Sequence, residues 1–245
     1  MLMSAIEGLK YAPSYPELAG KRILITGLSA GLGVDIARAF ADARCRLVLQ
    51  IDELTEEMQA VVEIIAAAAP DVKLYTGTAA TADAAVVVAR NAMTAFGGID
   101  AVINLVPLAA GTVAAATSAE AIEAAVAARL TMACLGGKIA ANRMRLTMID
   151  GLVLNVAMLP SQATKADRAF ASVAKAALTA MTRSAAEEWT EHGVRFNAIA
   201  PQCAGGLGEP SLAGEVDIAA LALFLASGRG RLLSGHVFEA TAGTR

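Results

Sequence analysis

The segment that most constrains this chain is a glycine-rich turn near its start. A short apolar run leads into Thr26 and Gly27, and glycines follow at Gly31 and Gly33 before a helix-like segment. Glycines let a backbone approach a pyrophosphate closely, and the N-terminus of the next helix offers N–H groups and a partial positive charge. The spacing Thr-Gly-x-x-x-Gly-x-Gly therefore predicts a strand, a phosphate-binding turn that contains Ser29, and a helix.

Short apolar strands alternate with helical segments along the rest of the chain. This alternation is typical of a parallel sheet covered by helices on both faces. We therefore expect an α/β fold, a single-domain doubly wound parallel sheet of Rossmann-like type with about seven strands. Strands are expected at 22–26, 47–51, 72–75, 101–104, 152–156, 195–199 and 236–239, and helices at 31–43, 53–69, 82–96, 118–147, 165–191 and 217–227.

The chain shows no internal repeat, linker or block of charge. We expect one domain over 21–245, preceded by an N-terminal arm over 1–20 that Pro13 and Pro16 keep extended. The long helix over 118–147 is expected to bend at its Gly-Gly pair.

Composition limits the partners and the compartment. The formal net charge of -3 gives no reason to expect nucleic acid or an anionic membrane surface. Two histidines and three scattered cysteines, Cys45, Cys134 and Cys203, form no metal or disulfide spacing, so no metal is expected. The uncharged stretch 101–119 is better explained by a buried strand and a loop than by a membrane span, and the chain start carries no signal pattern. These features favour a cytoplasmic protein.

Four further segments extend the pattern set by the glycine turn. They are FGGIDAVIN at 96–104, AKAALTAMTRSAAEEW at 174–189, GVRFNAIAP at 193–201 and DIAALALFLAS at 217–227. With TGLSAGLG, their order and spacing resemble the short-chain dehydrogenase/reductase family over 20–243. The resemblance implies an NAD(P)-dependent oxidoreductase for alcohols and carbonyls. It also implies a cofactor contact at Asn104 and at Lys175, whose family counterpart binds the nicotinamide ribose and lowers the pKa of a catalytic tyrosine.

The catalytic positions of the family are changed in this chain. Ala171 stands four residues before Lys175, where the family has its tyrosine, and Met158 stands where the family has a serine that polarises the substrate carbonyl. Arg129 replaces an asparagine of the proton relay. Lys175 is therefore the only retained member of the catalytic group. Losing one general acid costs about 10²–10⁴ in rate, and losing the acid, the carbonyl donor and the relay residue together is expected to leave at most substrate positioning.

The cofactor cleft also departs from the family pattern. Val106 and Pro107 are expected to add bulk beside the cofactor, and the aspartate that contacts adenine is missing after the third strand. The best alignment puts Ile51 at the position that selects NAD, while Asp52 is the acidic residue next to it. NAD or NADP therefore remains a candidate cofactor whose binding the sequence leaves in question. The loop 203–214 is expected to be a short lid.

Two residues have alternative interpretations. Ser172 is a candidate replacement nucleophile, but no histidine lies near it in sequence to activate it. Arg129 either reaches into the cleft as an anion site or pairs with an acid across a subunit contact, and we favour the second. The resemblance implies that the helices over 118–147 and 165–191 form that contact, in a homo-oligomer or in a hetero-oligomer with a related subunit.

Three functions follow from these observations. The first is a catalytically degenerate family member that acts as a non-catalytic subunit or binding module. The alternative is a working NAD(P)-dependent oxidoreductase of unusual mechanism, since Lys175 and the glycine turn are kept. The third is a dinucleotide sensor in which Gly27, Gly31 and Gly33 serve binding only.

Overall fold

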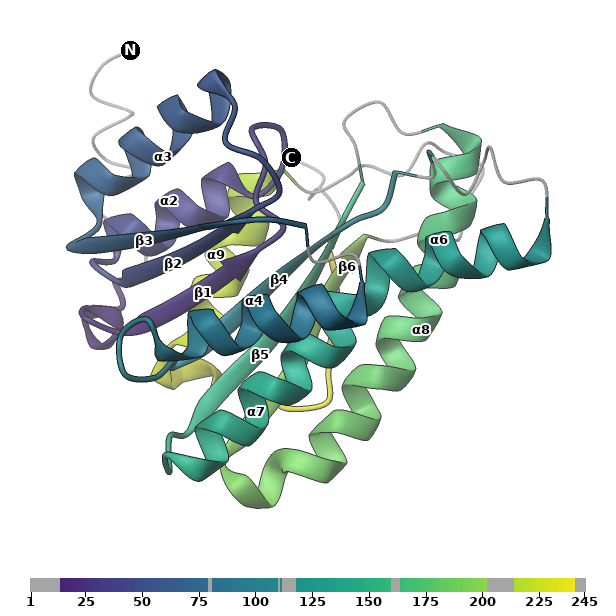
Figure 1. The fold of residues 1–245 in the computed structure, drawn as a ribbon. Coiled ribbons are helices and arrows are strands. Elements are labelled where there is room, and N and C mark those ends of the chain that lie inside the picture. The colour runs from purple at the N-terminus through teal and green to yellow at the C-terminus, as the bar shows by residue number, and fades with distance from the viewer. Residues whose placement is uncertain are drawn as a thin grey trace, which may run out of the picture.

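The computed structural model describes residues 14–78, 81–109, 111, 118–159, 164–201 and 214–240. Seven strands form one sheet in the order β3-β2-β1-β4-β5-β6-β7, and every neighbouring pair is parallel (Figure 1). The strand order changes direction between β1 and β4, which is where open α/β sheets bind ligands. The predicted doubly wound fold with about seven strands is confirmed.

The elements alternate along the chain as the sequence predicts. The strands are β1 Arg22–Thr26, β2 Arg46–Ile51, β3 Asp71–Thr76, β4 Ala101–Pro107, β5 Gly151–Met158, β6 Val194–Pro201 and β7 Val237–Ala240. The helices are α2 Val34–Asp42, α3 Glu56–Ala68, α4 Ala82–Thr94, α6 Ala119–Thr131, α7 Gly137–Leu146, α8 Lys165–Trp189 and α9 Glu215–Ala226. Short helical turns lie at η1 Pro16–Leu18, η2 Met132–Gly136, η3 Thr190–His192 and η4 Gly228–Gly230.

Helices cover both faces of the sheet. One apolar cluster joins one face of β1, β2 and β4 to α2, α3 and α9, and a second joins the other face to α4, α7 and α8. Figure 1 shows helices α4, α7 and α8 in front of the sheet, and α6 projecting beyond the sheet edge. Because side chains alternate along each strand, every inner strand must be apolar on both sides, which explains the continuous apolar runs in the sequence.

Side chains fix where four of the helices begin. The side-chain oxygens of Thr55, Thr81 and Ser118 each accept a hydrogen bond from the backbone N–H three residues further on. Thr164 does the same for Asp167, whose carboxylate accepts a hydrogen bond from the Thr164 N–H at 2.7 Å and so completes a capping box. Each cap stabilises its helix by about 1 kcal/mol.

The end of the expected N-terminal arm differs from prediction. Pro16–Leu18 forms a 3₁₀ turn instead of an extended segment, and Leu18 is 2% exposed within the core. The Leu18 carbonyl accepts a hydrogen bond from the Cys45 thiol at 3.2 Å. The expectation of an extended arm is therefore wrong for these residues, because the turn buries the Leu18 side chain, which stabilises the fold by about 1.5–3 kcal/mol.

The helix expected over 118–147 is one helical run with a π-helical turn in its middle. That turn, η2 Met132–Gly136, coincides with the predicted bend and is a known cause of bending in helices. Among the described residues this run, Ala119–Leu146, is the one helix long and apolar enough to cross a membrane by length and composition, with a mean hydropathy of 1.3. An equally apolar composition is also typical of a helix that packs against another protein chain. In the described structure α6 buries none of its own residues.

Arg22 and Asp100 form a partly buried ion pair between β1 and β4. The Arg22 backbone N–H and Nε donate to Asp100 Oδ2 at 2.8 Å each, and its NH2 group donates to Oδ1 at 3.0 Å. Burial raises the pKa of the Asp100 carboxyl, and the hydrogen bonds and charge of Arg22 lower it by more, so that this pKa lies below its usual value.

Asp100→Asn is expected to lower the free energy of unfolding by about 2 kcal/mol at neutral pH, because it removes charged hydrogen bonds from Arg22. A lowered carboxyl pKa stabilises the fold above the ordinary pKa of aspartate, and that stabilisation is lost as the pH falls through the lower value. Urea unfolding across acidic pH measures both effects. A variant as stable as the wild type at neutral pH would contradict this account.

Candidate ligand cavity

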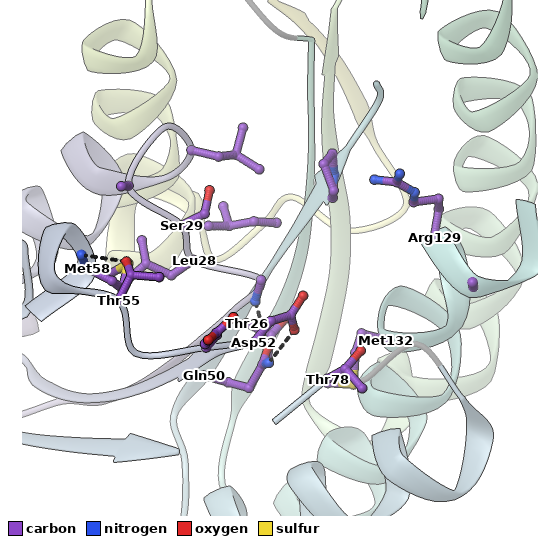
Figure 2. A pocket seen from close by; sticks show the side chains of 17 residues that line it. Thr26, Leu28, Ser29, Gln50, Asp52, Thr55, Met58, Thr78, Arg129 and Met132 are labelled. Atoms are coloured by element: carbon purple, nitrogen blue, oxygen red, sulfur yellow. Dashed lines mark hydrogen bonds between the residues drawn. The ribbon is translucent and has the colours of Figure 1, made fainter. Parts of the chain in front are cut away.

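A cavity of about 580 Å³ lies at the carboxyl ends of β1, β2 and β4 (Figure 2). Its volume is within the range of small-molecule sites. Residues from the glycine turn, the end of β2, the end of β4 and helix α6 form its walls. The lining residues are Thr26, Gly27, Leu28, Ser29, Ala30, Leu32, Gln50, Asp52, Glu53, Thr55, Met58, Thr78, Leu105, Pro107, Ala128, Arg129 and Met132.

The glycine turn needs glycine at two positions. Gly27 has a φ of 73° and Gly33 a φ of 86°, both in the left-handed region that glycine adopts readily. A Cβ atom on Gly27 would lie 2.7 Å from the Leu105 carbonyl oxygen, and one on Gly33 would lie 2.1 Å from Leu105 Cδ1. The turn is therefore packed directly against β4. Gly33 also serves as the N-cap of α2, which explains why the helix begins three residues later than predicted.

Several N–H groups of the turn already have partners. Gly27 N–H donates to Gln50 Oε1 at 2.8 Å, and Ser29 and Leu32 exchange backbone hydrogen bonds at 3.1 Å each. At the start of α2, Asp35 N–H donates to the Glu215 carboxylate at 2.8 Å. A negative group thus already stands at this helix N-terminus, as the helix dipole favours.

Gln50 is a site residue that the sequence reading missed. Its side chain is buried between the turn and the segment after β3, where Nε2 donates to the Gly77 carbonyl at 2.8 Å and to Asp52 Oδ1 at 3.3 Å. The sequence signal was a polar residue inside the apolar run RLVLQI. Gln50 fixes the glycine turn and orients the Asp52 carboxylate at the cavity wall.

The end of β2 supplies acidic groups to the cavity. Ile51, which the alignment put at the cofactor-selecting position, is buried in the core. Asp52 and Glu53 both line the cavity instead. Because strand residues alternate between faces, a one-residue offset decides which side chain reaches the ligand.

Asn104 is buried in a hydrogen-bonded group of side chains and does not line the cavity. The Thr26 hydroxyl donates to Asn104 Oδ1 at 3.0 Å, and Asn104 Nδ2 donates to Asn155 Oδ1 at 2.9 Å. The three side chains are buried and lie opposite one another on β1, β4 and β5. A cofactor contact by Asn104 stays a prediction, and the observed role is to satisfy buried polar groups across the sheet.

Of the two residues expected to add bulk beside the cofactor, one lines the cavity and the other does not. Leu105 and Pro107 line the cavity, whereas Val106 is buried in an apolar cluster on the opposite face of the sheet. The expectation that Val106 narrows the cleft is wrong, because alternate residues of β4 face opposite sides. Pro107 lines the cavity, as predicted.

The positions of the family's tyrosine and serine are apolar and buried. Ala171 is 0% exposed and belongs to one cluster with Val106 and Ala157, and Met158 is 7% exposed. Of the described tyrosines, neither Tyr15 nor Tyr75 lines the cavity. None of these side chains offers a proton to a ligand in the cavity.

Lys175 forms an ion pair and does not line the cavity. Its Nζ lies 2.7 Å from Glu239 Oε1 on β7, and the lysine side chain is 20% exposed. It lines a second hollow on α8 that also contains Ser172 and Thr179. A cofactor contact by Lys175 stays a prediction that requires this ion pair to break. The Ser172 hydroxyl donates to the Arg168 carbonyl of its own helix at 3.1 Å, as expected of an ordinary helix residue.

Arg129 lies where the less favoured interpretation puts it. Figure 2 shows its guanidinium extending from α6 into the cavity, and it lines the wall beside Ala128 and Met132. Within the single chain Arg129 lines the cavity, and an ion pair across a subunit contact stays a prediction. Among the described residues, no three His, Cys, Asp or Glu side chains come together as a metal site.

The residues present fit one half of a dinucleotide better than the other. At the β2 side, Asp52 offers a carboxylate for hydroxyl groups, and Leu28 and Met58 offer apolar walls. At the β4 and α6 side, the wall consists of Leu105, Pro107 and other apolar groups around Arg129. The site thus has the character of a nucleotide cleft at the switch point of a doubly wound sheet.

Comparison with known proteins agrees with this class of site. A family model described as short chain dehydrogenase matches residues 21–205. The chain is 32% identical over 243 residues to 2,5-dichloro-2,5-cyclohexadiene-1,4-diol dehydrogenase LinX of Sphingobium indicum, covering 89% of this chain and 94% of that protein. It is 29% identical over 246 residues to momilactone A synthase of Oryza sativa subsp. japonica, covering 90% and 88% of the two chains. The chain belongs to the short-chain dehydrogenase/reductase family.

Solved structures agree with the fold. The crystal structure of YwfH, an NADPH dependent reductase involved in bacilysin biosynthesis, superposes with a TM-score of 0.78. It shares 22% sequence identity, and the match covers 92% of this chain and 100% of that chain.

Proposed function

We propose that this chain is a catalytically degenerate member of its family that keeps a dinucleotide-binding cleft and acts as a non-catalytic subunit or binding module. The observation that carries the proposal is the chemistry of the catalytic positions. Ala171 and Met158 are buried apolar residues, and Lys175 is paired with Glu239. Hydride transfer to a carbonyl needs a proton for the resulting oxygen, and these positions supply none.

The chain's own residues suggest how NAD(H) would be held. Asp52, oriented by Gln50, would accept hydrogen bonds from ribose hydroxyls, and Glu53 adds a second negative charge nearby. The 2′-phosphate of NADP(H) would meet these carboxylates, so the proposal favours NAD(H). When bound, the nicotinamide supplies the hydride chemistry for which the family is known.

Calorimetric titration with NADH and NADPH tests the cleft. We expect NADH to bind about tenfold or more tightly than NADPH, and Asp52→Asn to reduce that preference, because one of the repelling charges is removed. Glu187→Gln on the exposed side of α8 is the matched control and should leave both affinities unchanged. The absence of binding by either cofactor at millimolar concentration would contradict the proposal.

A working NAD(P)-dependent oxidoreductase of unusual mechanism, acting on an alcohol or carbonyl substrate, is the second candidate. The relatives named dehydrogenase and synthase at 32% and 29% identity favour it. This candidate requires Lys175 to leave Glu239 and act in the cavity. Turnover by the wild type that disappears in Lys175→Ala would support it against the first proposal.

The proposal includes an oligomer built through α6, α7 and α8. Ile122 on α6 and Val173 on α8 are large apolar side chains that are 42% and 57% exposed in the single chain. Contact with a second copy or a related subunit would cover them. Cys45 and Cys134 are free thiols, which supports a reducing, cytoplasmic location.

A further inference from the structure

Arg129 is the cationic side chain of the cavity. Of the charged residues among its described lining, Asp52 and Glu53 lie at the β2 side, and Arg129 alone lies at the β4 and α6 side. Figure 2 shows Asp52 and Arg129 on opposite sides of the same hollow. The cavity is therefore polarised, with negative charge at one end and positive charge at the other.

Arg129 has no protein partner within the part of the chain that the structure describes. Arg22 and Arg46 each contact a carboxylate, and Lys175 contacts Glu239, whereas Arg129 makes neither an ion pair nor a side-chain hydrogen bond there. A guanidinium carries five donors in a planar fork that matches a carboxylate or phosphate. Its donors are thus available to a ligand.

The surroundings of Arg129 strengthen its attraction for an anion. Leu105, Pro107 and Met132 form apolar walls around this end of the cavity. Arg129 is half-buried, and charge-assisted hydrogen bonds gain strength as the surroundings of the charge become less polar. The same walls would contact the apolar body of a ligand, while its anionic group meets the guanidinium.

We propose that the cavity binds a small anionic ligand, with a carboxylate or phosphate on an apolar body, and that Arg129 is its bidentate partner. The inference rests on the proposed function only in taking this cavity as the ligand site. The arginine replaces the family's relay asparagine, so the change that removes a catalytic residue also creates a binding residue.

Calorimetry with three matched probes tests the inference: benzoate, phenyl phosphate and the neutral benzamide, each with and without saturating NADH. We expect one of the two anions to bind at least about tenfold more tightly than benzamide, and which anion does so distinguishes a carboxylate from a phosphate ligand. Arg129→Gln should lower the affinity for that anion by about tenfold to a hundredfold. Arg143→Gln, an exposed arginine of the same helical run, is the control and should have no effect.

Three results would overturn the inference. The first is that neither anion binds better than benzamide. The second is that the wild type and Arg129→Gln bind the anion equally well. The third is that Arg129→Gln loses as much affinity for NADH as it loses for the anion. The last would make Arg129 a contact of the cofactor phosphates. If NADH does not bind and an anion still binds through Arg129, the proposed dinucleotide function fails while the anion site stands.

Discussion

Gly27→Ala is expected to lower the free energy of unfolding by about 2–4 kcal/mol and to abolish NADH binding. The left-handed backbone at a φ of 73° costs an alanine roughly 1–2 kcal/mol. The added methyl group would also lie 2.7 Å from the Leu105 carbonyl oxygen, which is backbone of the neighbouring strand β4 and cannot rotate away. Urea unfolding and calorimetry with NADH measure the two effects.

Gly31→Ala is the matched control within the same turn. A Cβ atom on Gly31 would meet no atom within 4 Å, and this residue does not have a positive φ. Its free energy of unfolding should stay within about 0.5 kcal/mol of the wild type. Equal unfolding midpoints for Gly27→Ala and Gly31→Ala would contradict the packing of the turn against β4.

Ala171→Tyr, which restores the family's tyrosine, is expected to destabilise the protein by about 1–3 kcal/mol and to produce no turnover. Ala171 is fully buried in a cluster with Val106 and Ala157, so a phenol ring would overpack this region. Met158 would still lack a hydroxyl group, and Lys175 would still be paired with Glu239.

The measurement combines urea unfolding with oxidation of NADH in the presence of a panel of aldehydes and ketones. Ala176→Tyr adds the same ring at an exposed position of α8 and should be close to neutral in stability. If Ala171→Tyr kept full stability and raised turnover by about a hundredfold or more, the loss of function would rest on the tyrosine alone.

Most of the fold could be predicted because its signals are local. β1 coincides with the predicted segment, and the Gly-Gly pair marks the bend between α6 and α7. β4 runs three residues beyond its predicted end because Leu105 and Val106 continue the apolar alternation, and pairing with β5 extends to Pro107. Pro107 is tolerated because it stands at the end of the strand, where a missing backbone N–H costs little.

The site was harder to predict because it depends on which way single side chains point. Asp52 lines the cavity and Ile51 does not, a difference of one residue that alignment alone did not resolve. The partners Gln50 with Gly27 and Lys175 with Glu239 are separated by many residues in sequence. Sequence spacing identifies such residues as candidates, while only the assembled sheet brings them together.

We infer that this protein binds a dinucleotide without using it to reduce a carbonyl. The most direct test mixes the purified wild-type protein with NADH and a panel of aldehydes and ketones, and follows the fluorescence and the absorbance of the reduced nicotinamide together. We expect a fluorescence change that reports binding, with no loss of absorbance beyond the protein-free rate. Loss of absorbance over repeated turnovers would show instead that the protein is a working reductase.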